Sequence, residues 1–299
     1  MVTSPARLIA LDWGSTRLRA FLLGSDGTVL ASRQSEQGAS TLSGEAAFAA
    51  AFEAIQGDWP ALPVLACGMV GSQHGWREAP YAPCPADAAA LARHALKLHQ
   101  RFWILPGLMH DGALPDVMRG EETQIIGALA RHPELAVQCC LVLPGTHSKW
   151  ARVEAGRVMG FATHMTGELY ALLRQHSVLA RLMPADGTPA PSSGAFVAGV
   201  DAAREDGGLG HQLFTVRTLG LFKRLPPEHL PDYLSGLLIG HEIAHELASG
   251  APARLAVVGD PALCDRYAQA LGRFGLDAPL QLDNTAPAGL WRLAQTMGL

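Results

Sequence analysis

The stretch that most constrains this chain runs from Leu8 to Leu23, where a short polar turn joins two apolar segments. Asp12 stands at the end of the first segment, and Gly14, Ser15 and Thr16 fill the turn. Such a turn can present backbone N–H groups to an anion, and a carboxylate beside it can hold a hydrated cation. The stretch predicts a hairpin that binds phosphate and magnesium. An ordinary hairpin with Asp as a turn former is the alternative.

A second strand, turn and strand pattern occurs later in the chain. Leu141–Leu143 leads into the turn Pro144–Trp150, and strands are expected again at 151–153 and 157–161. Because residues 8–31 have the same order of elements, the pattern indicates a repeated unit. We expect the two turns to face each other as the two sides of a phosphate clamp. The second turn adds four candidate phosphate ligands: Gly145, Thr146, Ser148 and Lys149.

A loop rich in polar and aromatic side chains follows the apolar run Val64–Val70. Loops after buried strands often carry binding residues. Gln73, His74 and Arg77 could meet hydroxyls or a carboxylate, with Trp76 as a pocket wall. The alternative is a structured surface loop.

Three carboxylates, Asp116, Glu121 and Glu122, precede or begin the expected helix that contains Ile125–Leu129. One of them could act as a general base that orients a substrate hydroxyl. The alternative is that the acids only complement the positive end of the helix dipole.

Residues 241–245 read His-Glu-Ile-Ala-His, which formally matches the zinc peptidase pattern HExxH. A catalytic zinc needs a third protein ligand. The extended pattern requires Gly at 248 and His at 251, and both positions are Ala. Only a downstream Asp, at 260 or 265, is left for that role. A zinc peptidase is therefore an alternative that lacks its third ligand.

The composition narrows the classes of function. A net charge of −4 favours neither nucleic acid nor an anionic membrane as a partner. Five cysteines without CxxC spacing argue against a disulfide framework or a cysteine zinc site. With no signal peptide and no run long enough to span a bilayer, we expect a cytoplasmic protein. Neither a P-loop pattern nor GxGxxG is present.

Several longer blocks resemble the 2-dehydro-3-deoxygalactonokinase family, of the actin-like ATPase and sugar kinase superfamily. They cover nearly the whole chain and lie at 67–76 (CGMVGSQHGW), 115–124 (PDVMRGEETQ), 144–150 (PGTHSKW), 165–169 (MTGEL) and 233–240 (YLSGLLIG).

The resemblance implies an α/β fold with two actin-like (ribonuclease H-like) domains, each a mixed five-stranded sheet flanked by helices, and an ATP cleft between them. We expect residues 1–119 to form the substrate side and residues 120–285 the nucleotide side. The C-terminal helix, 286–299, can pack back on the first domain.

The resemblance also implies an activity: phosphorylation of the 6-hydroxyl of 2-dehydro-3-deoxy-D-galactonate with ATP and Mg²⁺, in galactonate catabolism. Asp12 would hold the hydrated Mg²⁺, and the residues of the two turns would cradle phosphates. Gly259 and Asp260, at a late strand-to-helix junction, would line the adenosine side. Gln73-His74-Gly75 would contact the substrate.

The chain departs from related kinases at the base, because Gly120 is followed by Glu and not by Asp. Glu121 is the first choice for the base, and Glu122 and Asp116 are the reserves. The substrate carboxylate needs a cation, for which Arg17, Arg77 and Arg119 stay open. A non-catalytic actin-like nucleotide sensor is a second alternative function, and a homodimer is compatible with the sequence.

Overall fold

The computed structural model describes residues 4–184 and 193–299, which form two compact units. The first unit contains residues 1–141, 151–162 and 284–299, and the second contains residues 142–150 and 163–283. The first unit therefore extends beyond residue 119, where we expected the first domain to end. Two helices account for this difference: α3 (Glu121–Arg131) packs against the C-terminal helix α9 (Ala286–Met297), and both belong to the first unit.

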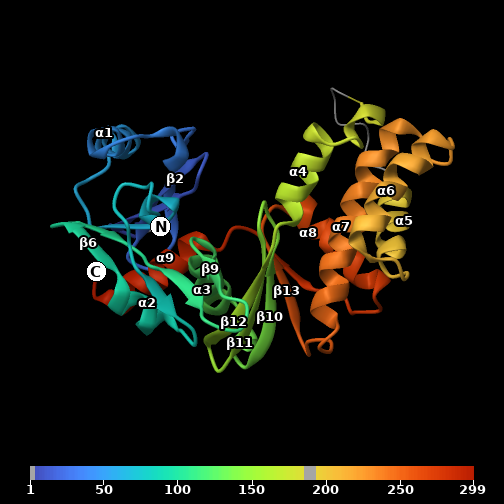
Figure 1. The fold of residues 1–299 in the computed structure, drawn as a ribbon. Helices are drawn as coiled ribbons and strands as arrows, with labels where there is room; N and C mark the ends of the chain where they lie inside the picture. The colour runs from blue at the N-terminus through green and yellow to red at the C-terminus, as the bar shows by residue number, and fades with distance from the viewer. Residues whose placement is uncertain (1–3, 185–192) are drawn as a thin grey trace. The chain divides into compact units, whose positions relative to one another are not determined.

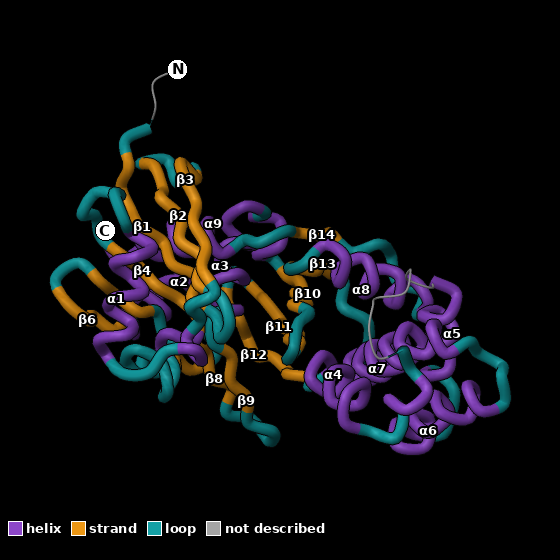
Figure 2. The backbone as a smooth tube through the Cα atoms, turned by 90° about the horizontal axis from the view of Figure 1, so that it is seen from above, coloured by secondary structure: helices purple, strands orange, loops and turns teal. Residues whose placement is uncertain are grey.

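The first unit is built on a mixed sheet that has six strands in the described part of the chain, one more than expected. Its first three strands pair antiparallel, as the opening hairpin predicts, and β1, β4 and β7 run parallel. Figure 2 shows β3, β2, β1 and β4 side by side. In spatial order the strands are β3 (Val29–Ser35), β2 (Leu18–Gly24), β1 (Ala6–Trp13), β4 (Val64–Gly68), β7 (Phe102–Ile104) and β6 (Leu96–His99). The strand β6 pairs antiparallel with β7 at the edge of the sheet.

Helices and a small second sheet complete the first unit. An apolar core forms between the large sheet and α1, because the buried strand residues pack against the aromatic face of that helix. The remaining elements are η1 (Ala39–Thr41), α1 (Glu45–Gln56), η2 (Met69–Gly71), α2 (Ala88–His94), η3 (Pro133–Ala136), and a three-stranded sheet of β5 (Tyr81–Pro83), β8 (Gly107–His110) and β9 (Asp116–Met118).

A mixed sheet of five strands, counted over the described residues, carries the second hairpin (Figure 1). In spatial order its strands are β12 (Arg157–His164), β11 (Ser148–Glu154), β10 (Gln138–Leu143), β13 (Leu255–Val258) and β14 (Leu280–Leu282). The order places the end of β10 beside β13. The phosphate turn and the late strand-to-helix junction are therefore brought together within the second unit.

The helices of the second unit form their own apolar core, in which α7 packs against α5 and α6 (Figure 1). Helix α7 is buried along most of its first three turns, which fits its apolar sequence. The helical elements of this unit are α4 (Thr166–His176), η4 (Ala180–Leu182), α5 (Ser193–Ala203), α6 (Gly208–Leu221), η5 (Pro227–His229), α7 (Leu230–Leu247) and α8 (Pro261–Arg273). Over the described residues, no helix is long and apolar enough to cross a membrane.

Candidate active site

The 3-10 helix η1 binds the first turn through backbone hydrogen bonds. The carbonyl oxygens of Gly14 and Ser15 accept hydrogen bonds from the backbone N–H groups of Ala39 and Ser40, at 2.9 and 3.0 Å. The side chains of Ser15 and Thr16 are exposed. The turn is therefore anchored through its carbonyl groups, while its hydroxyl side chains reach solvent.

Asp12 ends β1 beside this turn and pairs with Arg19 across the hairpin. Their Cα atoms are register partners, and the Arg19 Nη1 to Asp12 Oδ2 distance is 3.2 Å. Burial raises the pKa of Asp12 above its ordinary value, and the guanidinium of Arg19 opposes this shift. Both residues line a cavity of about 310 Å³ together with Gly14 and Thr16. Arg19 was not among the residues expected in the site, although its position opposite Asp12 in the hairpin was a signal for it.

Gly120 and Glu122 form the head of α3. Gly120 has a φ of 110°, a conformation that favours glycine, and its N–H donates to Glu122 Oε2 at 2.6 Å. Thr123 Oγ1 donates to Glu122 Oε1 at 3.0 Å. Glu122 is only 1% exposed. Burial and then repulsion from Glu121 raise the pKa of Glu122 to about 7.

Asp12 and Glu122 come together around Cys67. Cys67 is the register partner of Asp12 on β4, and burial together with the charges of Asp12 and Glu122 raises its pKa well above the ordinary value. The fold thus assembles two expected site carboxylates, far apart in sequence, at one end of the first sheet.

The two other candidate bases lie in different surroundings. Glu121 is partly exposed in the first turn of α3, and its Oε2 accepts a hydrogen bond from the backbone N–H of Arg119 at 3.1 Å. Asp116 lies on β9, and its Oδ1 accepts from the N–H of Val117 at 2.7 Å. Asp116 therefore does not belong to the head of the helix.

The expected substrate residues in the loop after β4 differ in their exposure to solvent. Gln73 and His74 are exposed, and the Gly75 N–H donates to the Ser72 carbonyl at 2.9 Å. Trp76 instead points into the core of the first unit, where its ring stacks on Phe48 with a centroid distance of 6.1 Å and contacts further core aromatics: Trp13, Phe52 and Phe102. Aromatic packing thus holds the indole against the core, and its role as a pocket wall stays a prediction.

The three candidate arginines differ in their partners. Arg17 and Arg77 are more than half exposed, and they lie near Glu36 and Glu45 at 3.4 and 3.7 Å. Arg119 stacks on the ring of Tyr81, 4.2 Å from its centroid, and its Nη2 donates to the Ala79 carbonyl at 2.8 Å. Its Nε and Nη1 atoms are buried and have no hydrogen-bond partner within residues 4–184 and 193–299.

The second turn lies against the start of α4. A Cβ atom on Gly167 would lie 2.3 Å from the Gly145 carbonyl oxygen, so only glycine allows this approach. The Glu168 N–H donates to the Thr146 carbonyl at 2.9 Å, and His147 Nε2 lies 2.5 Å from Glu168 Oε2. Space is open beside the Gly145 Cα atom, and Thr146 is exposed.

Ser148 and Lys149, the two other candidates from this turn, are buried at the start of β11, with exposures of 0% and 3%. The Ser148 hydroxyl donates to Glu242 Oε2 at 2.7 Å, and Lys149 Nζ donates to the His147 carbonyl at 3.2 Å. The structure therefore gives Ser148 an internal partner in place of the expected phosphate. Ser148 is buried because β11 enters the core directly after the turn.

Gly259 and Asp260 form the junction between β13 and α8. Gly259 has a φ of 153°, and a Cβ atom there would lie 3.7 Å from the Pro144 carbonyl oxygen. Asp260 caps α8 by accepting from the Leu263 N–H at 3.2 Å. The junction thus lies beside the second turn.

The HExxH match does not form a metal site. Glu242 is buried and, among the described residues, accepts hydrogen bonds from neutral side chains, while His241 Nε2 lies 2.5 Å from Gln212 Oε1. The His245 ring instead contacts that of His164. Within the described ranges, no group of three or more His, Cys, Asp or Glu residues could hold a metal ion. Nothing in the structure supports a zinc peptidase.

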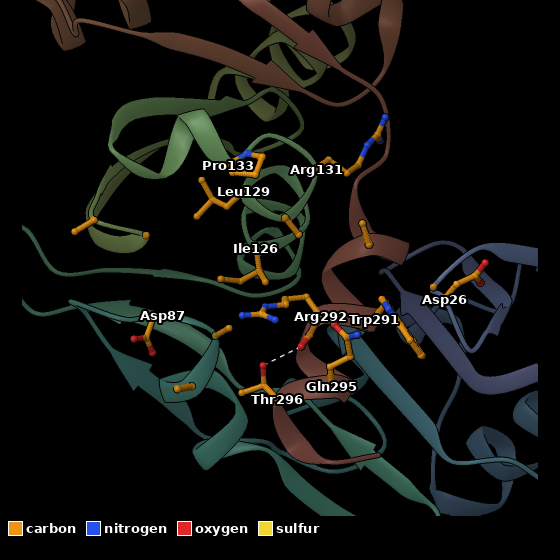
Figure 3. A pocket seen from close by; sticks show the side chains of 17 residues that line it. Asp26, Asp87, Ile126, Leu129, Arg131, Pro133, Trp291, Arg292, Gln295 and Thr296 are labelled. Carbon is orange, nitrogen blue, oxygen red and sulfur yellow. Dashed lines mark hydrogen bonds between the residues drawn. The ribbon is translucent and has the colours of Figure 1, made fainter.

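A cavity of about 770 Å³ lies elsewhere in the first unit, between the end of α3 and the C-terminal part of α9 (Figure 3). Arg131, Trp291 and Arg292 are among its lining residues, and none of the candidate site residues lines it.

The family model described as 2-keto-3-deoxy-galactonokinase matches residues 12–293 of this chain. The chain belongs to this family. The 2-dehydro-3-deoxygalactonokinase of Escherichia coli (strain K12) is 39% identical over 298 residues, which cover 98% of this chain and 99% of the relative. A crystal structure of a Sinorhizobium meliloti protein, proposed to be a 2-dehydro-3-deoxygalactonokinase, has a TM-score of 0.88 and 37% identity and covers 97% of this chain and 99% of its own.

A more distant structure supports the fold alone. The activator of 2-hydroxyisocaproyl-CoA dehydratase from Clostridium difficile, with bound ADPNP, has a TM-score of 0.50 and 11% identity and covers 97% of this chain and 96% of its own. The expected fold class, α/β with mixed sheets flanked by helices, is confirmed.

The residues present fit a nucleotide and Mg²⁺. Open space beside Gly145 and the nearby Gly259 form a backbone cradle without side chains. Asp12 offers one carboxylate, oriented by Arg19, to a cavity. Mg²⁺ is usually bound through one or two carboxylates, substrate phosphates and water, so a larger group of protein ligands is not needed.

Proposed function

We propose that this protein is an ATP-dependent kinase that phosphorylates the 6-hydroxyl of 2-dehydro-3-deoxy-D-galactonate and gives 2-dehydro-3-deoxy-6-phosphogalactonate, in galactonate catabolism. The observation that carries the proposal is the 39% identity to the Escherichia coli enzyme over 98% of this chain. Phosphoryl transfer needs positioning and charge neutralisation more than covalent chemistry by the protein. The site residues described above supply groups of these kinds.

We assign the general base to Glu121. A base must reach the substrate hydroxyl, and the side chain of Glu121 is partly exposed whereas that of Glu122 is 1% exposed. In this assignment Glu122 fixes the head of α3 through its bond from the Gly120 N–H, and its pKa of about 7 makes it the main competitor for the role.

We assign the substrate carboxylate to Arg119. Its Nε and Nη1 are buried without a partner in the described chain, and a buried unpaired donor is costly. A substrate carboxylate could accept a charge-assisted hydrogen bond from one of these two nitrogens. Arg17 and Arg77 are exposed beside glutamates and need no such partner. Gln73 and His74 would contact substrate hydroxyls.

We assign the nucleotide to the second unit. Thr146 and the backbone at Gly145 would hold phosphates, and Gly259 with Asp260 would line the adenosine side. In the first unit, Asp12 and the turn at Gly14 to Thr16 are proposed as further ligands for Mg²⁺ and phosphate. Asp12 would hold hydrated Mg²⁺, which supplies charge neutralisation at the phosphates when bound.

A coupled ADP-release assay over a panel of 2-oxo-3-deoxy acids tests the function. We expect turnover with the galactonate derivative, and the gluconate derivative measures the stereochemical preference. Tight ATP binding with no turnover on any of these acids would instead favour a non-catalytic nucleotide sensor. A homodimer and a cytoplasmic location stay predictions from the sequence, and light scattering tests the first.

A further inference from the structure

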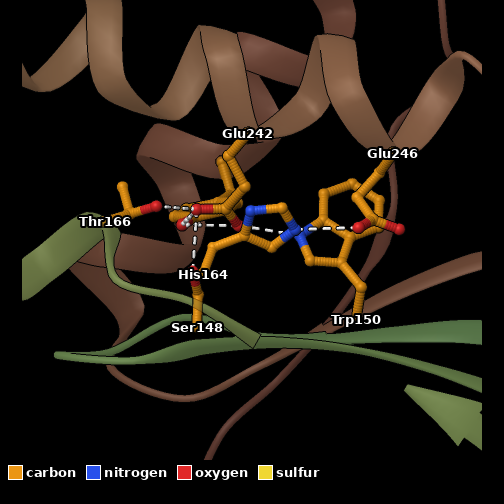
Figure 4. Close-up of polar contacts among 7 residues, drawn as sticks. Ser148, Trp150, His164, Thr166, Glu242 and Glu246 are labelled. Carbon is orange, nitrogen blue, oxygen red and sulfur yellow. Dashed lines mark hydrogen bonds and ion pairs between the residues drawn. The ribbon is translucent and has the colours of Figure 1, made fainter. Parts of the chain in front are cut away.

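Glu242 is a buried carboxylate for which the proposed chemistry has no direct use. It is 3% exposed, and four side chains donate to it (Figure 4). Trp150 Nε1 donates to Oε1 at 2.7 Å, and Ser148 Oγ donates to Oε2 at 2.7 Å. Thr166 Oγ1 also donates to Oε2, and the Tyr267 hydroxyl lies 3.0 and 2.9 Å from the two oxygens. All of its partners in the described chain are neutral.

A buried carboxylate without a neighbouring cation contributes little to the stability of a core, because its desolvation is unfavourable. Burial of a charge costs several kcal/mol unless hydrogen bonds replace its hydration. An apolar side chain of similar volume would often be as stable or more stable. The donor set around Glu242 therefore points to a role in fixing geometry.

The four donors come from elements around the nucleotide site assigned above. Ser148 directly follows the second turn, and Trp150 is on the same strand. Thr166 is the first residue of α4, where the next residue, Gly167, lies against Gly145. Tyr267 is on α8, the helix that begins after Gly259 and Asp260. One side chain thus connects the second turn, the start of α4 and the helix of the adenosine side.

We propose that Glu242 is a positioning residue that sets the second turn for the phosphates of the nucleotide. This inference rests on the proposed function, because it assumes that the turn binds ATP. It also accounts for the HExxH match without a metal. The central Glu242 makes hydrogen bonds within the second unit, and the two flanking His residues have other partners.

The test compares Glu242→Gln with Glu246→Gln, one helical turn further along α7. The amide nitrogen of glutamine donates and cannot accept a hydrogen bond, so Glu242→Gln leaves at least one of the four donors without its acceptor. Glu246 is also mostly buried and accepts from or pairs with His164 at 2.8 Å, but it does not touch the turn. We expect Glu242→Gln to raise the KM for ATP and the Kd for ADP, measured by calorimetry, about tenfold or more. The KM for the sugar acid should change less than twofold.

Glu246→Gln is expected to keep both KM values. Equal rises in the two KM values for Glu242→Gln, or an unchanged Kd for ADP in a folded variant, would overturn the positioning role. Circular dichroism and the melting temperature establish that each variant is folded.

Ser148→Ala is a second variant that tests the same role if Glu242→Gln does not fold. It removes one donor and leaves the other three, so the fold should survive. We expect a weaker effect of the same kind, a threefold or larger rise in the ATP KM, and Ser148→Thr should restore it. A wild-type ADP Kd in Ser148→Ala would contradict the inference. Failure of the wild-type protein to turn over any sugar acid would instead contradict the proposed function, and the ADP Kd values would still decide the role of Glu242.

Discussion

Gly289 of α9 lies against the backbone of Thr123 of α3, so closely that a Cβ atom on Gly289 would be 1.9 Å from the Thr123 carbonyl oxygen. The contact is reciprocal, since a Cβ atom on Gly127 would be 2.0 Å from the Thr285 carbonyl oxygen. Thr285 Oγ1 also donates to the Gln124 carbonyl at 2.7 Å. The C-terminal helix is thereby fixed to the helix that carries the candidate base.

Gly289→Ala should lower the free energy of unfolding by about 3 kcal/mol, because the added methyl group meets backbone that cannot move aside within a packed core. Thermal and urea denaturation measure this change. Gly210→Ala is the matched control, because Gly210 lies in α6 and a Cβ atom added there would meet nothing within 4 Å. That variant should be unchanged or more stable by about 0.5 to 1 kcal/mol. Equal melting temperatures for Gly289→Ala and the wild type would show that the helices are not so closely packed.

Glu122 should make stability fall as the pH rises toward neutrality. Its pKa is about 7 in the folded protein against an ordinary value of 4.5. Between these two values the folded protein holds a proton that the unfolded chain releases. The contribution of Glu122 to the free energy of unfolding is therefore fully present below about pH 4.5 and is lost as the pH rises through 7. Glu122→Gln should remove a decline of about 3 kcal/mol between pH 5 and pH 8.

Urea unfolding at a series of pH values measures this slope. The exposed Glu53, on α1, provides the control substitution Glu53→Gln, which should keep the wild-type slope. If Glu122→Gln also keeps that slope, its carboxylate does not titrate near neutral pH.

Asp12→Asn should reduce kcat about a hundredfold or more and leave the fold intact, because an amide cannot supply the negative charge that places Mg²⁺. Steady-state kinetics at saturating Mg²⁺ measure the loss. Asp26→Asn, in an exposed turn of the same unit, is the control and should keep kcat within about twofold, since substitutions at exposed sites away from the chemistry have small effects. A wild-type kcat for Asp12→Asn would remove Asp12 from the mechanism.

Glu121→Gln should cut kcat by about a hundredfold or more with little change in the KM for the sugar acid, as expected for loss of a general base. Asp116→Asn should have a much smaller effect, because its carboxylate bonds locally on β9. Comparison of the kcat values of Glu121→Gln, Glu122→Gln and Asp116→Asn identifies the base. If Asp116→Asn alone shows the loss, both the assignment to Glu121 and the local role of Asp116 are wrong.

Arg119→Lys should raise the KM for the sugar acid about ten- to a hundredfold, since the ammonium group of lysine does not place donors where the planar guanidinium holds them. The KM for ATP should not change. Arg77→Lys, at an exposed position, is the control with an expected change below about twofold. The reverse result, with the larger effect at Arg77, would move the carboxylate site to the loop after β4.

The sequence was most informative where local chemistry fixes structure. The opening three strands follow from apolar runs separated by turn residues. The family and the fold class also followed from blocks of local sequence, and both are confirmed.

Tertiary packing set side-chain directions that the local sequence pattern does not reveal. Trp76 was expected to line a pocket because its neighbours are polar, but the indole fills the core beside Phe48. Ser148 was expected to bind phosphate as part of a polar turn, but β11 carries its hydroxyl to Glu242. Neither side-chain direction is set by the residues next to it in sequence.

The sequence by itself determined the elements, the family and the residue types available for catalysis, because strands, turns and caps depend on neighbours a few positions apart. Only the tertiary structure brought Asp12, Cys67 and Glu122 to one end of a sheet, and only it joined Glu242 to Ser148, 94 positions away. These groups meet because sheet order and helix packing bring distant segments together, and burial then raises the pKa of Glu122 and gives Glu242 its partners.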